Sequence, residues 1–250
     1  MIRLFDKTKV FLSVISARRP TTMEPMTELI GDATWFVDSA SLDEYGRELV
    51  KHDLASTVTE ADGLVEARNA ALDAAASVGA DVCVELSDDL KKIEEPYYSD
   101  ERKKYMAREL GFPAAIRRMI TGLSSTGASL AGVAPTSNPF YYRGKPVHPK
   151  AFIVGDLIMV RTKSPIRFDP QLRLKEDYDF TLAHLSTKVG RVARCDDVLA
   201  TFLHRKNAGG AVAYRTPEAE QEAIAVLKRK WGARIKDNPK RPDEILLKLR

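Results

Sequence analysis

Short apolar runs alternate with amphipathic segments over the first 90 residues, and this alternation limits the folds open to the chain. The apolar runs have the length of buried strands, and the segments between them carry apolar residues at helical spacing. Strands and helices that alternate with short connections predict an α/β fold in which helices flank a mostly parallel sheet. The predicted strands are residues 10–16, 33–39, 54–58 and 81–87, and the predicted helices are residues 26–32, 42–52 and 64–78.

The second half of the chain is less regular. Residues 122–132 are rich in small side chains but lack the Gly-Lys-Ser/Thr ending of a phosphate-binding loop, so we expect a flexible loop that leads into a strand. A strand pair is expected around Gly155 and Asp156, and a long strand region that breaks near Asp196. The predicted helices are residues 100–110, 114–123, a helix headed by Lys175, Glu176 and Asp177, and residues 218–231, followed by a basic tail to residue 250.

Composition narrows the class of protein. No run of about 18 apolar residues could span a membrane, and the N-terminus lacks the pattern of a signal peptide, so we expect a soluble, cytoplasmic protein without a membrane partner. The two cysteines, Cys83 and Cys195, lie inside apolar runs, which favours reduced core residues over a disulfide or zinc site. The net charge of +4 is compatible with a polyanionic partner but does not require one.

Two adjacent carboxylates, Asp88 and Asp89, follow the fourth predicted strand. In parallel α/β sheets, ligands bind at the carboxyl ends of the strands, so this pair stands where a site is expected. Adjacent carboxylates repel each other, and a hard divalent cation bound by oxygen atoms relieves the repulsion. The alternative interpretation is structural: Ser87 or Asp88 caps a helix that starts at Leu90.

Basic residues also gather at the predicted strand ends. Arg18 and Arg19 follow the first strand, and Arg68 lies in the first turns of the third helix. Several cations at one edge of a sheet suit a ligand that bears phosphate groups. His204 follows a later strand, beside a basic pair and a Gly-rich loop, and is available as a metal ligand, although lone histidines are more often structural.

Two further segments each allow two interpretations. Glu176 and Asp177 could serve chemistry, or they could simply favour the dipole of the helix that they begin. Residues 135–146 combine three aromatic residues, two bases and several prolines. Such a loop could stack on a flat ligand or a nucleic-acid base, or it could be a packed surface loop.

With these motifs in order, the chain resembles the GT-A-type glycosyltransferases, which have a Rossmann-like, mostly parallel sheet. Within that group it is similar to the TET/JBP-associated glycosyltransferases of phages and bacteria. The resemblance covers residues 11–249 and implies a single GT-A-like domain over 1–250, with a nucleotide-sugar half at about 10–120 and a smaller acceptor half at about 121–250. It rests on FLSVISARRP, MTELIGDATWFVD, GLVEARNAALD, CVELSDDLKK, RLKEDYDFTLAHL, CDDVLATFLHRKNAGGAVAYRT and NPKRPDEILLKL.

The resemblance implies roles for the donor-side residues. The stretch Ser87-Asp88-Asp89 fills the DxD-like motif that holds a divalent metal (Mn²⁺ or Mg²⁺) and the nucleotide-sugar, which we expect to be a UDP-sugar. Ser87 stands where the family often has its first Asp, and Asp89 is the expected metal ligand. His204 matches the late histidine that completes the metal site. Arg18 and Arg68 match basic positions near the uracil or diphosphate.

The resemblance also implies a catalytic base and an acceptor. Glu176 and Asp177 match the xED motif, whose carboxylate removes the proton of the acceptor hydroxyl; Asp177 is the first choice and Glu176 the second. The group is thought to glycosylate 5-hydroxymethylpyrimidines, so the expected partner is DNA that carries 5-hydroxymethylcytosine, made in a bacterial or phage-infected cell. The alternatives are a glycosyltransferase for a protein or glycan, and a non-enzymatic nucleic-acid-binding module on a degenerate transferase fold.

Overall fold

Four parallel strands form the half of the central sheet that the N-terminal alternation predicts. In the computed structural model, which describes residues 2–203, 215–241 and 244–249, they lie in the order β4-β3-β2-β5. The helices are α1 (Met23–Ile30), α2 (Leu42–Lys51), α3 (Leu64–Ser77), α4 (Phe112–Thr126), α5 (Glu176–Leu185) and α6 (Pro217–Trp231). The strands are β1 (Ile2–Phe5), β2 (Thr8–Ile15), β3 (Thr34–Val37), β4 (Thr57–Glu60), β5 (Val82–Ser87), β6 (Leu90–Ser99), β7 (Lys104–Glu109), β8 (Leu130–Val133), β9 (Val147–His148), β10 (Leu157–Arg161), β11 (Ala193–Cys195), β12 (Leu199–Phe202), β13 (Ile235–Asp237) and β14 (Ile245–Leu247).

The second half of the chain extends the same sheet. Strand β10 pairs antiparallel with β5 and β8, and β11 and β9 follow at the far edge. The pairing of β10 with β5 places the residues before β10 beside the end of β5, where the Ser87 amide donates to the Asp156 carbonyl at 2.8 Å. Segments about 70 residues apart in the sequence therefore meet at one edge of the sheet.

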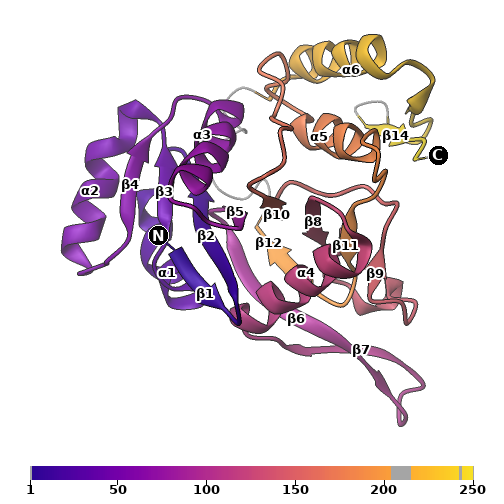
Figure 1. The fold of residues 1–250 in the computed structure, drawn as a ribbon, viewed down its shortest axis with the longest axis horizontal. Helices are drawn as coiled ribbons and strands as arrows, with labels where there is room; N and C mark the ends of the chain where they lie inside the picture. The colour runs from indigo at the N-terminus through magenta and orange to yellow at the C-terminus, as the bar shows by residue number, and fades with distance from the viewer. Residues whose placement is uncertain (1, 204–214, 242–243, 250) are drawn as a thin grey trace.

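Helices cover both faces of the sheet, as Figure 1 shows. On one face, α1, α2 and α4 pack through Met26, Tyr45 and Met119 onto a core that includes Trp35. On the other face, α3 and α5 bury an apolar layer against the same strands, and α3 uses the alanine-rich face that the sequence predicts. A third cluster joins α6, β13 and β14 to the outer side of α5. Both cysteines are free and buried, as expected.

Residues 100–110 are not helical, so that prediction is wrong. They form a turn and strand β7, which pairs antiparallel with β6 in a three-stranded sheet with β12. The sequence of this segment favours a helix locally, but pairing with β6 decides its structure. Leu90 begins strand β6, so no helix starts there, and the helix-cap interpretation of Ser87 and Asp88 is also wrong.

Two smaller predictions are corrected. The small-residue stretch at 122–132 is not a loop throughout, because α4 continues to Thr126 and ends at Gly127, whose φ of +69° suits a left-handed helix end. The expected strand pair around Gly155 is a single strand, β10, which follows an extended segment. Within the described residues, no helix combines the length and the apolar character needed to cross a membrane.

Candidate functional site

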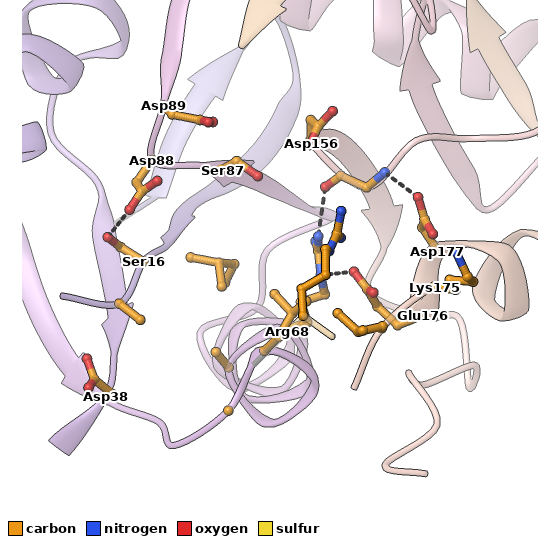
Figure 2. Close-up of a pocket in the computed structure, with 18 of the residues that line it drawn as sticks. Ser16, Asp38, Arg68, Ser87, Asp88, Asp89, Asp156, Lys175, Glu176 and Asp177 are labelled. Atoms are coloured by element: carbon orange, nitrogen blue, oxygen red, sulfur yellow. Dashed lines mark hydrogen bonds and ion pairs between the residues drawn. The ribbon is translucent and has the colours of Figure 1, made fainter. Parts of the chain in front are cut away.

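A pocket of about 1190 Å³ opens at the carboxyl ends of the four parallel strands. Its walls come from the loops after β2, β3, β4 and β5, from the segment before β10, and from the first turn of α5. Figure 2 shows the strand-end acids Asp88 and Asp89 on one side and Glu176 and Asp177 on the other. The pocket brings together seven of the eight predicted site residues: Arg18, Arg68, Ser87, Asp88, Asp89, Glu176 and Asp177. The eighth, His204, lies outside the described residues.

Asp88 is anchored by the first strand's loop. One carboxylate oxygen accepts a hydrogen bond from Ser16 Oγ, and the other forms an ion pair with Arg19 Nη1 at 2.8 Å. Burial raises the pKa of Asp88, and the contacts with Ser16 and Arg19 oppose that rise. Ser16 and Arg19 thus each contact one oxygen of Asp88, and its neighbour Asp89, a carboxylate that is 7% exposed, also lines the pocket.

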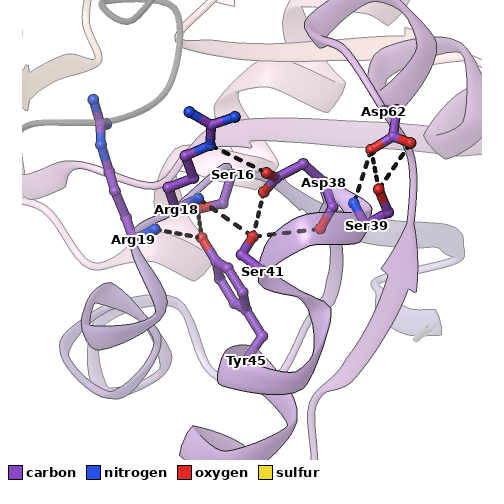
Figure 3. Close-up of polar contacts among 8 residues, drawn as sticks. All are labelled: Ser16, Arg18, Arg19, Asp38, Ser39, Ser41, Tyr45 and Asp62. Carbon is purple, nitrogen blue, oxygen red and sulfur yellow. Dashed lines mark hydrogen bonds and ion pairs between the residues drawn. The ribbon is translucent and has the colours of Figure 1, made fainter.

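The mouth of the pocket carries acids that the sequence analysis missed. Figure 3 shows Arg18 donating from Nε to Asp38, which follows β3, at 3.4 Å; the Arg18 side chain is 65% exposed. Asp62, which follows β4, accepts hydrogen bonds from Ser39, whose backbone amide chiefly lowers the pKa of this carboxyl group. Each acid stands directly after or near the end of a predicted strand, and that signal could have identified both.

Arg68 lies at the centre of a buried ionic cluster. Its guanidinium group donates to Glu85 Oε2 at 3.0 Å and to the Gly155 carbonyl at 3.0 Å, and it lies 3.3 Å from Glu176 Oε1. The group also lies over the ring of Phe168, with 5.2 Å from Cζ to the centroid. Arg68 is 4% exposed, so its guanidinium joins strand β5, the segment before β10 and the start of α5.

Gly155 fits this cluster because it has no side chain. A Cβ atom there would meet Arg68 Nη2 at 2.8 Å and Asp177 Cβ at 3.4 Å. Its amide instead donates to Asp177 Oδ2 at 3.3 Å, while its carbonyl accepts from Arg68. The two backbone groups of one residue, Gly155, thus contact both side chains.

The carboxyl group of Asp177 has a pKa near neutrality. Loss of solvation, with the neighbouring Glu176 carboxylate, raises its pKa to about 7, and Arg68 acts in the opposite direction. A carboxylate with a pKa near neutrality can both accept and release a proton at physiological pH. Asp177 lines the pocket two residues after Lys175, a non-glycine residue at φ +59°, and Arg18 at the opposite wall has φ +58°. Backbone strain of this kind concentrates at functional sites.

Glu85 is a further residue that the sequence analysis missed. It is fully buried on β5, pairs with Arg68, and has a pKa of about 7, raised chiefly by burial. A single acid inside the apolar run of residues 81–87 was the available signal. Because its carboxyl group lies in the core, it cannot contact a ligand, so its role is to hold Arg68.

This burial predicts that the protein loses stability as pH rises from about 4.5 to about 7. Over that range the folded Glu85 keeps a proton that the unfolded chain releases, so raising the pH favours unfolding. We expect Glu85→Gln to reduce the fall in melting temperature between pH 5 and pH 8. Exposed Glu44→Gln is the matched control and should leave the pH dependence unchanged. An identical pH dependence in wild type and Glu85→Gln would contradict this assignment.

The oxygen donors in the pocket suit a hard divalent cation. Asp89 and Asp156 both line it, and carboxylate oxygens are the ligands that Mn²⁺ and Mg²⁺ accept. Within residues 2–203, 215–241 and 244–249, no three His, Cys, Asp or Glu side chains gather closely enough to hold a metal together. A cation held by Asp89 would therefore complete its coordination with other oxygens, such as water and the phosphates of a nucleotide.

Comparison with known proteins supports the fold. No protein-family model matches the chain, and no curated protein matches it. Among solved structures, it is similar to the mannosyltransferase PcManGT from Pyrobaculum calidifontis in complex with GDP-Man and Mn²⁺, with 14% identity, a TM-score of 0.57, and coverage of 88% of this chain and 64% of the other. It is also similar to S. aureus TarS, with 14% identity, a TM-score of 0.52, and coverage of 88% of this chain and 39% of TarS.

The chain thus has a GT-A-like fold, the α/β fold of nucleotide-sugar transferases, as the sequence predicts. It spans less than two thirds of the length of either of these proteins.

Proposed function

We propose that this protein is a metal-dependent glycosyltransferase that moves a sugar from a UDP-sugar to the hydroxymethyl group of 5-hydroxymethylcytosine in DNA. The observation that carries the proposal is the pocket itself. It presents strand-end acids on one wall and a carboxylate with a pKa of about 7 on the other. Its volume of about 1190 Å³ is sufficient for a nucleotide-sugar. The similarity to a mannosyltransferase in complex with GDP-Man and Mn²⁺ supports a nucleotide-sugar donor and a divalent metal.

In the proposed reaction, the acceptor hydroxyl oxygen attacks the anomeric carbon as the bond between that carbon and the diphosphate breaks. Asp177 takes the hydroxyl proton, and Glu176, held by Arg68, keeps the pKa of Asp177 high. The diphosphate leaves as UDP, towards the wall that Arg18 and Ser87 line. A divalent cation, when bound at Asp89, supplies positive charge against the growing charge of the leaving group.

The DNA acceptor is proposed from the resemblance of the sequence. In this scheme residues 10–120 form the donor half, residues 121–250 form the acceptor half, and the protein works in the cytoplasm of a bacterial or phage-infected cell. The loop at 135–146 supports a flat acceptor, because Phe140 and Tyr141 are exposed and lie edge-to-face with centroids 5.4 Å apart. Exposed aromatic rings can stack on an unpaired base.

The direct test is the mass that the protein adds to hydroxymethylated DNA. DNA with 5-hydroxymethylcytosine is incubated with Mn²⁺ and a panel of UDP-sugars, and the nucleosides are analysed by mass spectrometry. One hexose-type mass increase with one donor is the expected result, and unmodified DNA is the matched control. Transfer only to a protein or glycan would replace the DNA acceptor. DNA binding without donor hydrolysis or a melting shift from UDP and Mn²⁺ would indicate the non-enzymatic module.

The pKa of Asp177 predicts the pH dependence of transfer. A general base works in its deprotonated form, so kcat/KM should rise about tenfold per pH unit below pH 7 and level off above it. Rates are measured from pH 5.5 to 8.5 at constant ionic strength and metal concentration. In Asp177→Asn the residual activity should lack this rise. If kcat/KM of the wild type did not change between pH 5.5 and 8.5, Asp177 would not be the general base.

A further inference from the structure

Strands β6 and β7 form a ribbon that projects beyond the sheet that supports it. Strand β12 pairs with β6 from Leu90 to Glu94, and β6 and β7 then continue together for five more residue pairs, from Glu95–Arg108 to Ser99–Lys104. Those pairs span about 17 Å before the turn. Figure 1 shows the ribbon pointing away from the body of the molecule. A two-stranded ribbon gains little stability of its own, so its extension into solvent calls for a role.

The ribbon and the adjacent loop carry the net charge of the protein. Residues 96–108 and 139–145 contain six cationic residues and two carboxylates, which gives a net charge of +4. The whole chain has a formal net charge of +4, so the remaining 230 residues are neutral in sum. Within the described part of the chain, no ion pair engages Arg102, Lys103, Lys104 or Lys145. These cations are available to a polyanion.

Aromatic residues are concentrated in the same two segments. These 20 residues hold six aromatic residues, against 8% aromatic residues in the chain as a whole. Tyr98 and Tyr142 each pack edge-to-face against Tyr105, with centroids 5.5 and 4.9 Å apart, which joins the ribbon to the loop. Tyr98, Phe140 and Tyr141 are 50%, 66% and 60% exposed, and Tyr97, which points to the opposite face of the ribbon from Tyr98, is 37% exposed.

The base of the ribbon is braced against the body of the molecule. Glu95 pairs with Arg108 on β7 and with Arg118 on α4, and Arg118 reaches Asp197 at 3.5 Å in the turn before β12. Strand β6 begins at Leu90, directly after Asp89 of the pocket. Strand β6 then runs about 17 Å from Leu90 to Glu95 before the ribbon begins, so a nucleic-acid strand bound on the ribbon lies at least that far from the pocket.

We propose that the ribbon of residues 96–108, with the loop of residues 139–145, binds single-stranded nucleic acid at the far end of the strand that begins beside the pocket. The cations bind backbone phosphates, and the exposed rings stack on unpaired bases, a combination typical of single-strand binding. The identity of the bound strand as the acceptor rests on the proposed function, but binding itself does not. Stacking requires bases outside a duplex, so the inference also assigns the single-stranded state to the acceptor.

The test is fluorescence anisotropy with a labelled single-stranded DNA 20-mer, a duplex of the same sequence, and an abasic 20-mer. We expect the normal single strand to bind most tightly. Tyr98→Ala and Tyr141→Ala should each weaken its binding roughly 5- to 100-fold, and Tyr→Phe at the same positions should restore it. Lys103→Ala with Lys104→Ala should reduce the salt slope by about 1.4. Lys51→Ala on α2, away from the ribbon, is the matched control.

The inference would be overturned if the abasic and normal strands bound equally well, which would indicate a general polyanion surface. It would also be overturned if the duplex bound more tightly, which would indicate a duplex-binding surface. Normal single-strand binding in the tyrosine variants would overturn the inference as well. The proposed function is tested independently, by measuring donor hydrolysis and sugar transfer to the hydroxymethylated nucleoside. If the protein binds the single strand but transfers no sugar, only the proposed function is contradicted. If it transfers sugar and the tyrosine variants bind the single strand as tightly as the wild type, only this inference is contradicted.

Discussion

Replacing Asp89 with Ala or Asn is expected to lower sugar transfer by about 1000-fold, because the variants lose a carboxylate that would hold the cation. Asp88 should compensate only weakly, since Ser16 and Arg19 each already contact one of its oxygens. The measurement is transfer at saturating donor with increasing Mn²⁺, together with the melting shift produced by UDP with and without Mn²⁺. Both variants should lose the part of the shift that depends on Mn²⁺.

Asp89→Asn separates a metal defect from a folding defect. It keeps the shape of a side chain that is 7% exposed while removing its charge, so its melting temperature without ligands should stay close to that of the wild type. Asp43→Asn, which neutralises an exposed acid on α2 outside the pocket, is the matched control. It should retain Mn²⁺-dependent transfer, because Asp43 does not line the site. Transfer by Asp89→Asn at the wild-type rate would rule out Asp89 as the metal ligand.

Most of the donor half was predictable because its signals are local. Each parallel strand is a short apolar run, each helix has an apolar face, and parallel strands bring their carboxyl ends to one edge. That reasoning led from Arg18 and Ser87 to a single pocket. Applied to every strand end, it would also have identified Asp38 and Asp62, which lie in the same pocket.

The predictions that were wrong or incomplete concern features that depend on contacts between distant segments of the chain. Residues 100–110 have a composition that favours a helix, yet the partner strand β6 fixes them as a strand through a register that no local pattern shows. The cluster around Arg68 is similar, because Glu85, Gly155 and Glu176 come from separate parts of the chain. The sequence singled out Arg68 as basic and close to a site, but it could not show which carboxylates surround it.

Replacing Arg68 with Met is expected to destabilise the protein by about 3–5 kcal/mol, the cost of leaving buried carboxylates without their partner. Both Glu85 and Glu176 lose an ion pair, at 0% and 9% side-chain exposure. The loss should be larger at pH 8.5 than at pH 5.5, because Glu85, with a pKa of about 7, is protonated at the lower pH. Chemical denaturation at both pH values measures it, and adding Glu85→Gln should recover part of the loss.

The same variant distinguishes two roles for Arg68. If Arg68 positions the base, its removal raises the pKa of Asp177, since Arg68 now lowers it, and the pH profile of transfer moves to higher pH. If Arg68 instead binds the donor, as the sequence resemblance implies, its removal raises the KM for the UDP-sugar and leaves stability and the pH profile nearly unchanged. The geometry favours the first outcome, because its guanidinium group already engages Glu85, Glu176 and the Gly155 carbonyl. A large rise in the KM for the UDP-sugar without a shift of the pH profile of transfer would indicate that Arg68 binds the donor.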